Sequence, residues 1–203
     1  MINILEMILI VFMISLNVNV KKDDKINQNA KASVSNSVKS KIDNKEKIFK
    51  FIKLVQPKFT DNHVSEITEA IILYSNKYKI DPMLTTSVAY VESEFNMRSK
   101  PCIGIMQLVR TSIKFYDPFK QYNPHTIRGN IAIGCIEIAK HYSNIRSDGL
   151  LPSRSSTRTV LLRYNGSRFK YSYAIKVMRV KSRIKEWDID QIKKYIKINS
   201  LWN

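Results

Sequence analysis

The spacing of apolar residues is the feature that most restricts the fold of this chain. Between residues 60 and 187 apolar side chains recur every three or four positions, the period of one helix face. The stretches with this spacing are Thr60–Tyr78, Pro82–Phe95, Ile127–Tyr142, Thr157–Tyr164 and Tyr173–Trp187. The chain contains only 5 Gly and 6 Pro, too few for a turn-rich β-barrel. The sequence therefore predicts a mainly α fold built as a single globular domain.

Capping residues indicate where several of these helices begin and end. Asp61 or Asn62 is placed to cap the first stretch. The pair Asp81-Pro82 combines a capping carboxylate with proline at the first helical position, which is a strong start signal. The pair Asn165-Gly166 is a typical helix stop. We expect a last, basic helix in residues 188–203, beginning at one of the two aspartates there.

The composition divides the 203 residues into four parts. Residues 1–20 hold an apolar segment, and residues 21–58 are polar and rich in Lys, which is typical of a flexible tether. Helical apolar spacing returns briefly at Ile48–Val55 within that tether. Residues 59–187 form the expected catalytic domain, and residues 188–203 the C-terminal helix.

The apolar segment predicts export from the cytoplasm. Residues 7–18 carry no charge and have the length of a signal-peptide core or a short membrane anchor. We therefore expect a cell-envelope, periplasmic protein, either secreted or associated with the membrane through residues 4–18.

Positive charge predicts a polyanionic partner. The chain has 34 Lys+Arg against 17 Asp+Glu, a formal net charge of +17. The net charge is +6 for residues 1–58, +1 for residues 59–145 and +10 for residues 146–203, where 7 of the 14 cations are Arg. Nucleic acid, an anionic membrane and an acidic wall polymer all fit this excess.

One glutamate, Glu92, lies where burial would raise its pKa. Taking Leu84 as the origin of a helical wheel, Val88 and Phe95 fall within about 40° of it, and Glu92 lies at about 80°. Glu94 lies about 100° from the centre of this stripe, toward solvent. We expect Glu92 to be half-buried, with a raised pKa suited to a general acid, although a boundary glutamate in an ordinary hydrogen bond would look the same.

Short motifs around Glu92 resemble those of a known enzyme family. In order, they are Val91-Glu92-Ser93-Glu94-Phe95-Asn96, Gly104-Ile105-Met106-Gln107-Leu108, Asn130-Ile131 with Gly134, Tyr164-Asn165-Gly166, and Tyr173 through Val177. This series is similar to the soluble-type lytic transglycosylase (SLT) domain, which is related in fold to goose-type lysozyme. The resemblance covers about residues 62–182.

The resemblance implies a role for each matching residue. Glu92 corresponds to the catalytic acid/base, and Tyr164 to a tyrosine that contacts it. The residues implied to bind the glycan are Ser93, Gly104, Met106, Gln107, Tyr164 and Asn165. Other interpretations stay open: Met106 and Tyr164 as core residues, and Asn165-Gly166 as a helix stop only.

The implied reaction cleaves the bond between N-acetylmuramic acid and N-acetylglucosamine in peptidoglycan. The glutamic acid protonates the glycosidic oxygen, the substrate's N-acetyl group stabilises the cation, and the glutamate then takes the proton of the muramyl 6-hydroxyl, forming a 1,6-anhydro end. This chemistry needs one carboxyl and neither metal nor cofactor. The alternative is lysozyme-type hydrolysis with Asp117 as a second carboxylate.

The chain departs from the family pattern at two places. Only 12 residues separate Glu92 from Gly104, where the family usually has a longer stretch with a Gly-Ala pair, so we expect a shortened groove wall at residues 97–103. Arg163 stands where the family usually has Ala, which adds a cation near the site.

The remaining chemistry-bearing residues give weaker signals. Cys102 and Cys135 are either independent thiols, with Cys135 buried, or a disulfide in an oxidising compartment. His63, His125 and His141 are far apart and lack the spacing of metal ligands, so we expect no metal site.

Two non-enzymatic functions remain as alternatives. A nucleic-acid-binding protein would use the basic last third with its aromatic residues, but no nucleic-acid motif accompanies it. A catalytically dead glycan-binding protein is the other alternative, against which stands the joint presence of Glu92, Gln107 and Tyr164. The favoured partner is peptidoglycan, with a secretion, phage or mobile-element machine as a further expected partner.

Overall fold

The computed structural model describes residues 43–147, 154–166, 170–186 and residue 197. The described residues are mainly helical, which confirms that the fold is mainly α. The helices are α2 (Asp61–Lys77), α3 (Pro82–Ser93), α4 (Arg110–Tyr116), α5 (Ile127–Ser147), α6 (Arg154–Asn165) and α7 (Lys170–Glu186), and residues 43–55 are helical as well. In this part of the chain, β-type pairing is limited to one bridge between Ile103 and Leu108. The expected helix in residues 188–203 falls outside the described residues, except for residue 197.

The helix starts follow the capping signals with one difference. Asp81 caps α3 as predicted, because its carboxylate accepts the backbone N–H of Met83 at 2.9 Å. At α2 the cap is Thr60, whose hydroxyl oxygen accepts the N–H of His63 at 3.3 Å, and the prediction of Asp61 or Asn62 is wrong. Thr60 has extended backbone angles, so it has the geometry that a capping residue requires.

Helix α3 ends at Ser93, two residues before the predicted end at Phe95. Glu94 and Phe95 both have positive φ, at 52° and 67°, which breaks the helix. Phe95 nevertheless stays buried, with its ring edge-on to Phe51 at a centroid distance of 6.0 Å. The turn therefore keeps the apolar side chain in the core and leaves Glu92 in the last turn of the helix.

The sequence predicts a polar tether for residues 21–58, but residues 44–58 of that range are folded. Residues 43–55 are helical, and Ile48, Phe51 and Ile52 are buried in the core. The compact unit begins at Asn44, so residues 44–58 belong to the folded domain. The lysines on either side of these residues and at position 50 give the segment its polar composition.

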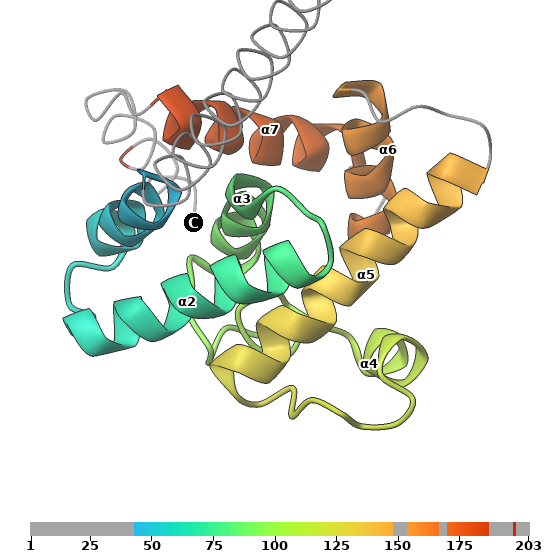
Figure 1. Cartoon of the computed structure of the whole chain (residues 1–203), viewed down its shortest axis with the longest axis horizontal. Helices are drawn as coiled ribbons and strands as arrows, with labels where there is room; N and C mark the ends of the chain where they lie inside the picture. Colours follow the sequence, from blue (N-terminus) through green and yellow to red (C-terminus); the bar gives the residue numbers. More distant parts are fainter. Residues whose placement is uncertain (1–42, 148–153, 167–169, 187–196, 198–203) are drawn as a thin grey trace, which may run out of the picture. The chain divides into compact units, whose positions relative to one another are not determined.

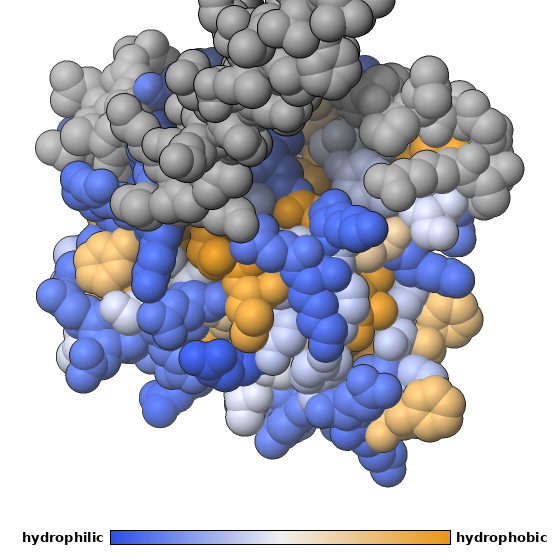
Figure 2. All heavy atoms as spheres, viewed as in Figure 1, coloured by the Kyte–Doolittle hydropathy of each residue, from blue (hydrophilic) through white to orange (hydrophobic). Residues whose placement is uncertain are grey.

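Helix α3 forms the centre of the compact unit (Figure 1). Its residues from Met83 to Tyr90 are all buried, so it is covered on every side, unlike an amphipathic surface helix. It packs against α2 and α7, while α5 packs against α2, α4 and α6. In Figure 2, hydrophilic residues cover much of the visible face, with hydrophobic side chains showing in gaps between them.

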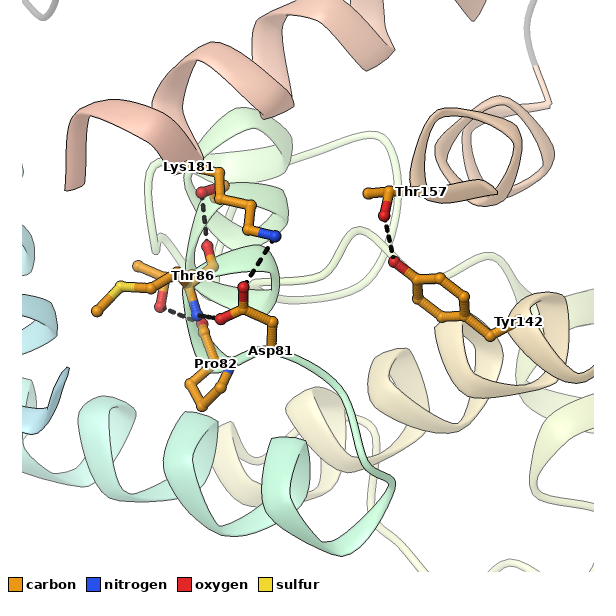
Figure 3. Close-up of polar contacts among 8 residues, drawn as sticks. Asp81, Pro82, Thr86, Tyr142, Thr157 and Lys181 are labelled. Atoms are coloured by element: carbon orange, nitrogen blue, oxygen red, sulfur yellow. Dashed lines mark hydrogen bonds and ion pairs between the residues drawn. The ribbon is translucent and has the colours of Figure 1, made fainter. Parts of the chain in front are cut away.

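Polar contacts fix α7 and α6 on their neighbours (Figure 3). The Lys181 ammonium on α7 pairs with the Asp81 carboxylate at the start of α3, at 2.8 Å. The hydroxyls of Tyr142 on α5 and Thr157 on α6 lie 2.9 Å apart. The first contact holds α7 beside α3, the helix that carries Glu92, and the second holds α6 against α5.

No helix in the described part of the chain combines the length and the hydrophobicity that a membrane span requires. The apolar run at residues 4–18 lies outside the described residues.

Candidate active site

The Glu92 carboxyl opens into a cavity of about 290 Å³. The last turn of α3 and residues 94–99 form most of its lining, and Gln56 and Lys176 complete it from other elements. The Gln56 amide donates to the Glu94 carbonyl at 2.9 Å, which fastens the segment before α2 to the end of α3. Glu94 also lines this cavity and is half-buried, so it is less exposed than a residue on a fully solvated helix face.

Glu92 has the protonation behaviour of a general acid and base. Burial raises its pKa from 4.5 to about 7. The hydrogen bond from Tyr173 and the charge of Lys176 favour the ionised form and limit the rise. At neutral pH the carboxyl is therefore close to half protonated, and it can both give and take a proton.

The hydrogen-bond partner of Glu92 is Tyr173 on α7. Its hydroxyl donates to Oε1 of Glu92 at 2.5 Å. Tyr164, expected to contact this carboxyl, donates instead to the carbonyl of Met106 at 2.8 Å. Burial, and then the negative charge of Glu92, raise the Tyr164 pKa well above its usual value, so Tyr164 is an electrostatic neighbour of the acid. The sequence did contain a signal for Tyr173. It lies four residues before Val177 on the apolar face of its helix, where its hydroxyl group stands out.

The segment from Gly104 to Gln107 does not line the cavity, but it contacts Ser93 at the end of α3. Gly104 has φ 70°, and a Cβ there would lie 2.3 Å from the Asn130 amide nitrogen. Met106 is fully buried against Gly134, which is the core role that the sequence left open. Met106 therefore does not line the Glu92 cavity, and its expected role at the glycan-binding groove stays a prediction.

Gln107 uses its side chain within its own loop. Its amide nitrogen donates to the carbonyls of Ser99 and Gly104, at 3.1 and 2.9 Å, and its Oε1 accepts the N–H of Cys102 at 3.3 Å. These bonds hold the short loop at residues 97–103. Gln107 thus shapes the cavity wall through Ser99, which lines the cavity.

Two of the residues expected to bind the glycan, Ser93 and Asn165, differ in their position relative to the Glu92 cavity. Ser93 lines the cavity beside Glu92, as expected, and its hydroxyl donates to the Ile105 carbonyl at 2.8 Å. That bond ties the Gly104–Gln107 segment to the end of α3. Asn165 is the half-buried last residue of α6, and it is not among the described residues that line the Glu92 cavity.

Glu137 on α5 is a second buried acid that the sequence interpretation missed. It is 8% exposed, and the Ser112 hydroxyl donates to its Oε1 at 3.2 Å. Burial and, to a smaller extent, the negative charge of Glu92 together raise its pKa from 4.5 to about 7, against the opposing effect of the Ser112 hydrogen bond. The available signal was its spacing, because Glu137 follows Gly134 by three residues and lies on the buried face of that helix.

Asp117 has a structural role in this fold. Its carboxylate accepts the backbone N–H groups of Gln121 and Tyr122 at 2.8 and 2.9 Å. Both oxygens are engaged in holding the loop after α4. Glu137, by contrast, is a buried acid whose pKa the negative charge of Glu92 raises.

The raised pKa of Glu137 predicts a pH-dependent effect of Glu137→Gln. Between pH 4.5 and 7 the folded protein keeps this proton while the unfolded chain loses it, so rising pH destabilises the wild type. Glutamine does not titrate. The unfolding free energy of the variant, relative to wild type, should therefore increase by about 3 kcal/mol over this interval. Urea unfolding at several pH values measures it. As a control, Glu66→Gln changes an exposed position of α2, and its unfolding free energy should have the same pH dependence as that of the wild type. If Glu137→Gln changed the unfolding free energy by the same amount at every pH, the prediction would be contradicted.

Both cysteines are free thiols in the described structure. Cys135 is buried, Cys102 is half-buried, and burial raises the pKa of Cys135 to about 12. This agrees with the interpretation of two independent thiols. Among the residues that the structure describes, no group of three or more His, Cys, Asp or Glu side chains is placed to hold a metal ion.

Comparison with protein-family models, curated proteins and solved structures gives no match to this chain.

Proposed function

We propose that this chain is a peptidoglycan lytic transglycosylase with a lysozyme-like catalytic domain. The observation that carries the proposal is Glu92: a half-buried carboxyl with a pKa of about 7, hydrogen-bonded to Tyr173 and open to a cavity. The ordered motifs from Val91 to Tyr173 support the same family. The N-terminal segment and the basic last third support an envelope location near an anionic wall.

The proposed reaction uses Glu92 twice. Its protonated form gives a proton to the glycosidic oxygen between N-acetylmuramic acid and N-acetylglucosamine, and that bond breaks. The substrate's own N-acetyl oxygen stabilises the cation. Ionised Glu92 then takes the proton of the muramyl 6-hydroxyl, whose oxygen closes the 1,6-anhydro ring. Glu92 ends protonated again, so atoms and protons balance.

Tyr173 and Lys176 would assist the charged stage of this cycle. When Glu92 ionises, the Tyr173 hydroxyl is already bonded to Oε1, and the Lys176 ammonium lines the same cavity. Both favour the carboxylate, in the direction opposite to burial. A pKa near 7 is the balance that lets one group serve as acid and then as base.

Hydrolysis of the same bond is the second candidate. The buried Glu137 favours it, because hydrolases of this type commonly use a second carboxylate to activate water or to stabilise the cation. In this candidate function Glu137, and not Asp117, would be the second carboxylate.

The products distinguish these functions. The purified full chain is incubated with isolated cell-wall sacculi, and the soluble fragments are identified by mass spectrometry. Anhydro-muramyl ends are expected; reducing ends would indicate hydrolysis. If no fragment is released and the chain instead binds DNA with a steep salt dependence, the enzyme proposal fails.

A further inference from the structure

A second cavity, of about 400 Å³, lies between α6 and α7. Arg158 contributes from α6, and Arg179, Ser182 and Arg183 contribute from α7. None of its lining residues also lines the Glu92 cavity. The two cavities therefore use different faces of α7, and an occupant of one would not compete directly with an occupant of the other.

The cations of α7 are divided between these faces. Lys176 lines the Glu92 cavity, and Lys181 pairs with Asp81 at 2.8 Å. Arg179 and Arg183, four residues apart, share one face of the helix and line the second cavity, which Arg158 joins from α6. In the part of the chain that the structure describes, neither Arg158 nor Arg179 forms an ion pair. Positive charge in this cavity is thus available to a ligand.

The lining suits a phosphate group. Guanidinium groups bind phosphate oxygens in pairs of parallel hydrogen bonds, and the Ser182 hydroxyl adds a single donor. Arginine outnumbers acid in the lining, where Glu186 is the acid, so the cavity carries net positive charge and attracts an anionic phosphate ester. Ile175, which is 41% exposed, and Met178 line the same cavity and provide apolar contact for a group attached to the phosphate.

We propose that the cavity between α6 and α7 is a binding site for a phosphate ester, of a kind found in anionic lipid headgroups and in soluble phosphates. The site would hold the domain at a phosphate-bearing surface and is independent of the reaction at Glu92. It also gives the arginine-rich last third of the chain a specific function beyond general attraction to anions.

Two probes test the proposal on the full chain. Inorganic phosphate is titrated while the side-chain N–H signals of arginine are followed by NMR, and binding to phosphatidylglycerol vesicles is measured by sedimentation against phosphatidylcholine vesicles. The variant Arg158→Gln/Arg179→Gln should weaken binding to the anionic vesicles about 30-fold, because each basic residue at such a surface contributes about fivefold.

A matched control removes the same charge elsewhere. Lys140→Gln/Lys185→Gln changes two exposed positions outside the cavity, on α5 and α7. A larger loss for the arginine variant than for this control supports a lipid ligand. Phosphate-induced shifts of the arginine signals, with equal vesicle binding in both variants, support a soluble phosphate. The proposal is overturned if phosphate causes no shift and both variants lose vesicle binding equally.

Discussion

Replacing Glu92 by Gln should reduce the release of wall fragments about 10²–10⁴-fold, the contribution typical of a general acid–base group. The amide has the size of the acid and can still accept the Tyr173 hydrogen bond, but it cannot donate a proton to the glycosidic oxygen. Initial rates of fragment release from isolated sacculi at pH 7 measure the effect.

The loss should reflect chemistry and not unfolding. Glu92 is a carboxyl whose burial opposes ionisation, so a neutral amide at this position should leave stability at pH 7 unchanged or increased. Thermal unfolding of the variant checks this. Glu66→Gln, on the exposed face of α2, is the control and should retain the wild-type rate. A Glu92→Gln variant that is folded and retains the wild-type rate would refute the assignment of Glu92 as the acid.

Local sequence signals predicted the features that depend on neighbouring residues. The pair Asp81-Pro82 located the start of α3, because an N-cap and a proline act within one turn. The helical wheel placed Glu92 beside an apolar stripe, and burial does raise its pKa. Both inferences required only the geometry of a single helix.

Features that depend on tertiary contacts were less predictable. Tyr173 reaches Glu92 from 81 residues away, and nothing local separates it from Tyr164 as the partner of the acid. Ile48 and Phe51 are core residues in a segment whose composition is dominated by lysine. Positive φ at Glu94 and Phe95 ended α3 early, although the apolar Phe95 fits the helical period.

The Asn130 side chain is hydrogen-bonded to three backbone groups near the candidate site. Its Oδ1 accepts the N–H of Met106 at 2.8 Å, and its amide nitrogen donates to the carbonyls of Ile103 and Pro124 at 2.9 and 3.0 Å. The side chain is fully buried, so no water is available to replace it. It therefore fixes the Gly104–Gln107 segment, which Ser93 ties to the end of α3.

Asn130→Ala should lower the unfolding free energy by about 4 kcal/mol, because buried backbone groups lose their partners at about 1–3 kcal/mol each. Urea unfolding measures it. As a control, Asn123→Ala removes one exposed hydrogen bond to the His125 N–H and should cost less than about 1 kcal/mol.

Gly104→Ala should also destabilise the fold, since its Cβ would lie 2.3 Å from the Asn130 amide nitrogen. That clash disappears when residue 130 is alanine, so the double variant should be more stable than the sum of the two losses predicts. Strict additivity would show that Asn130 and Gly104 do not meet as described.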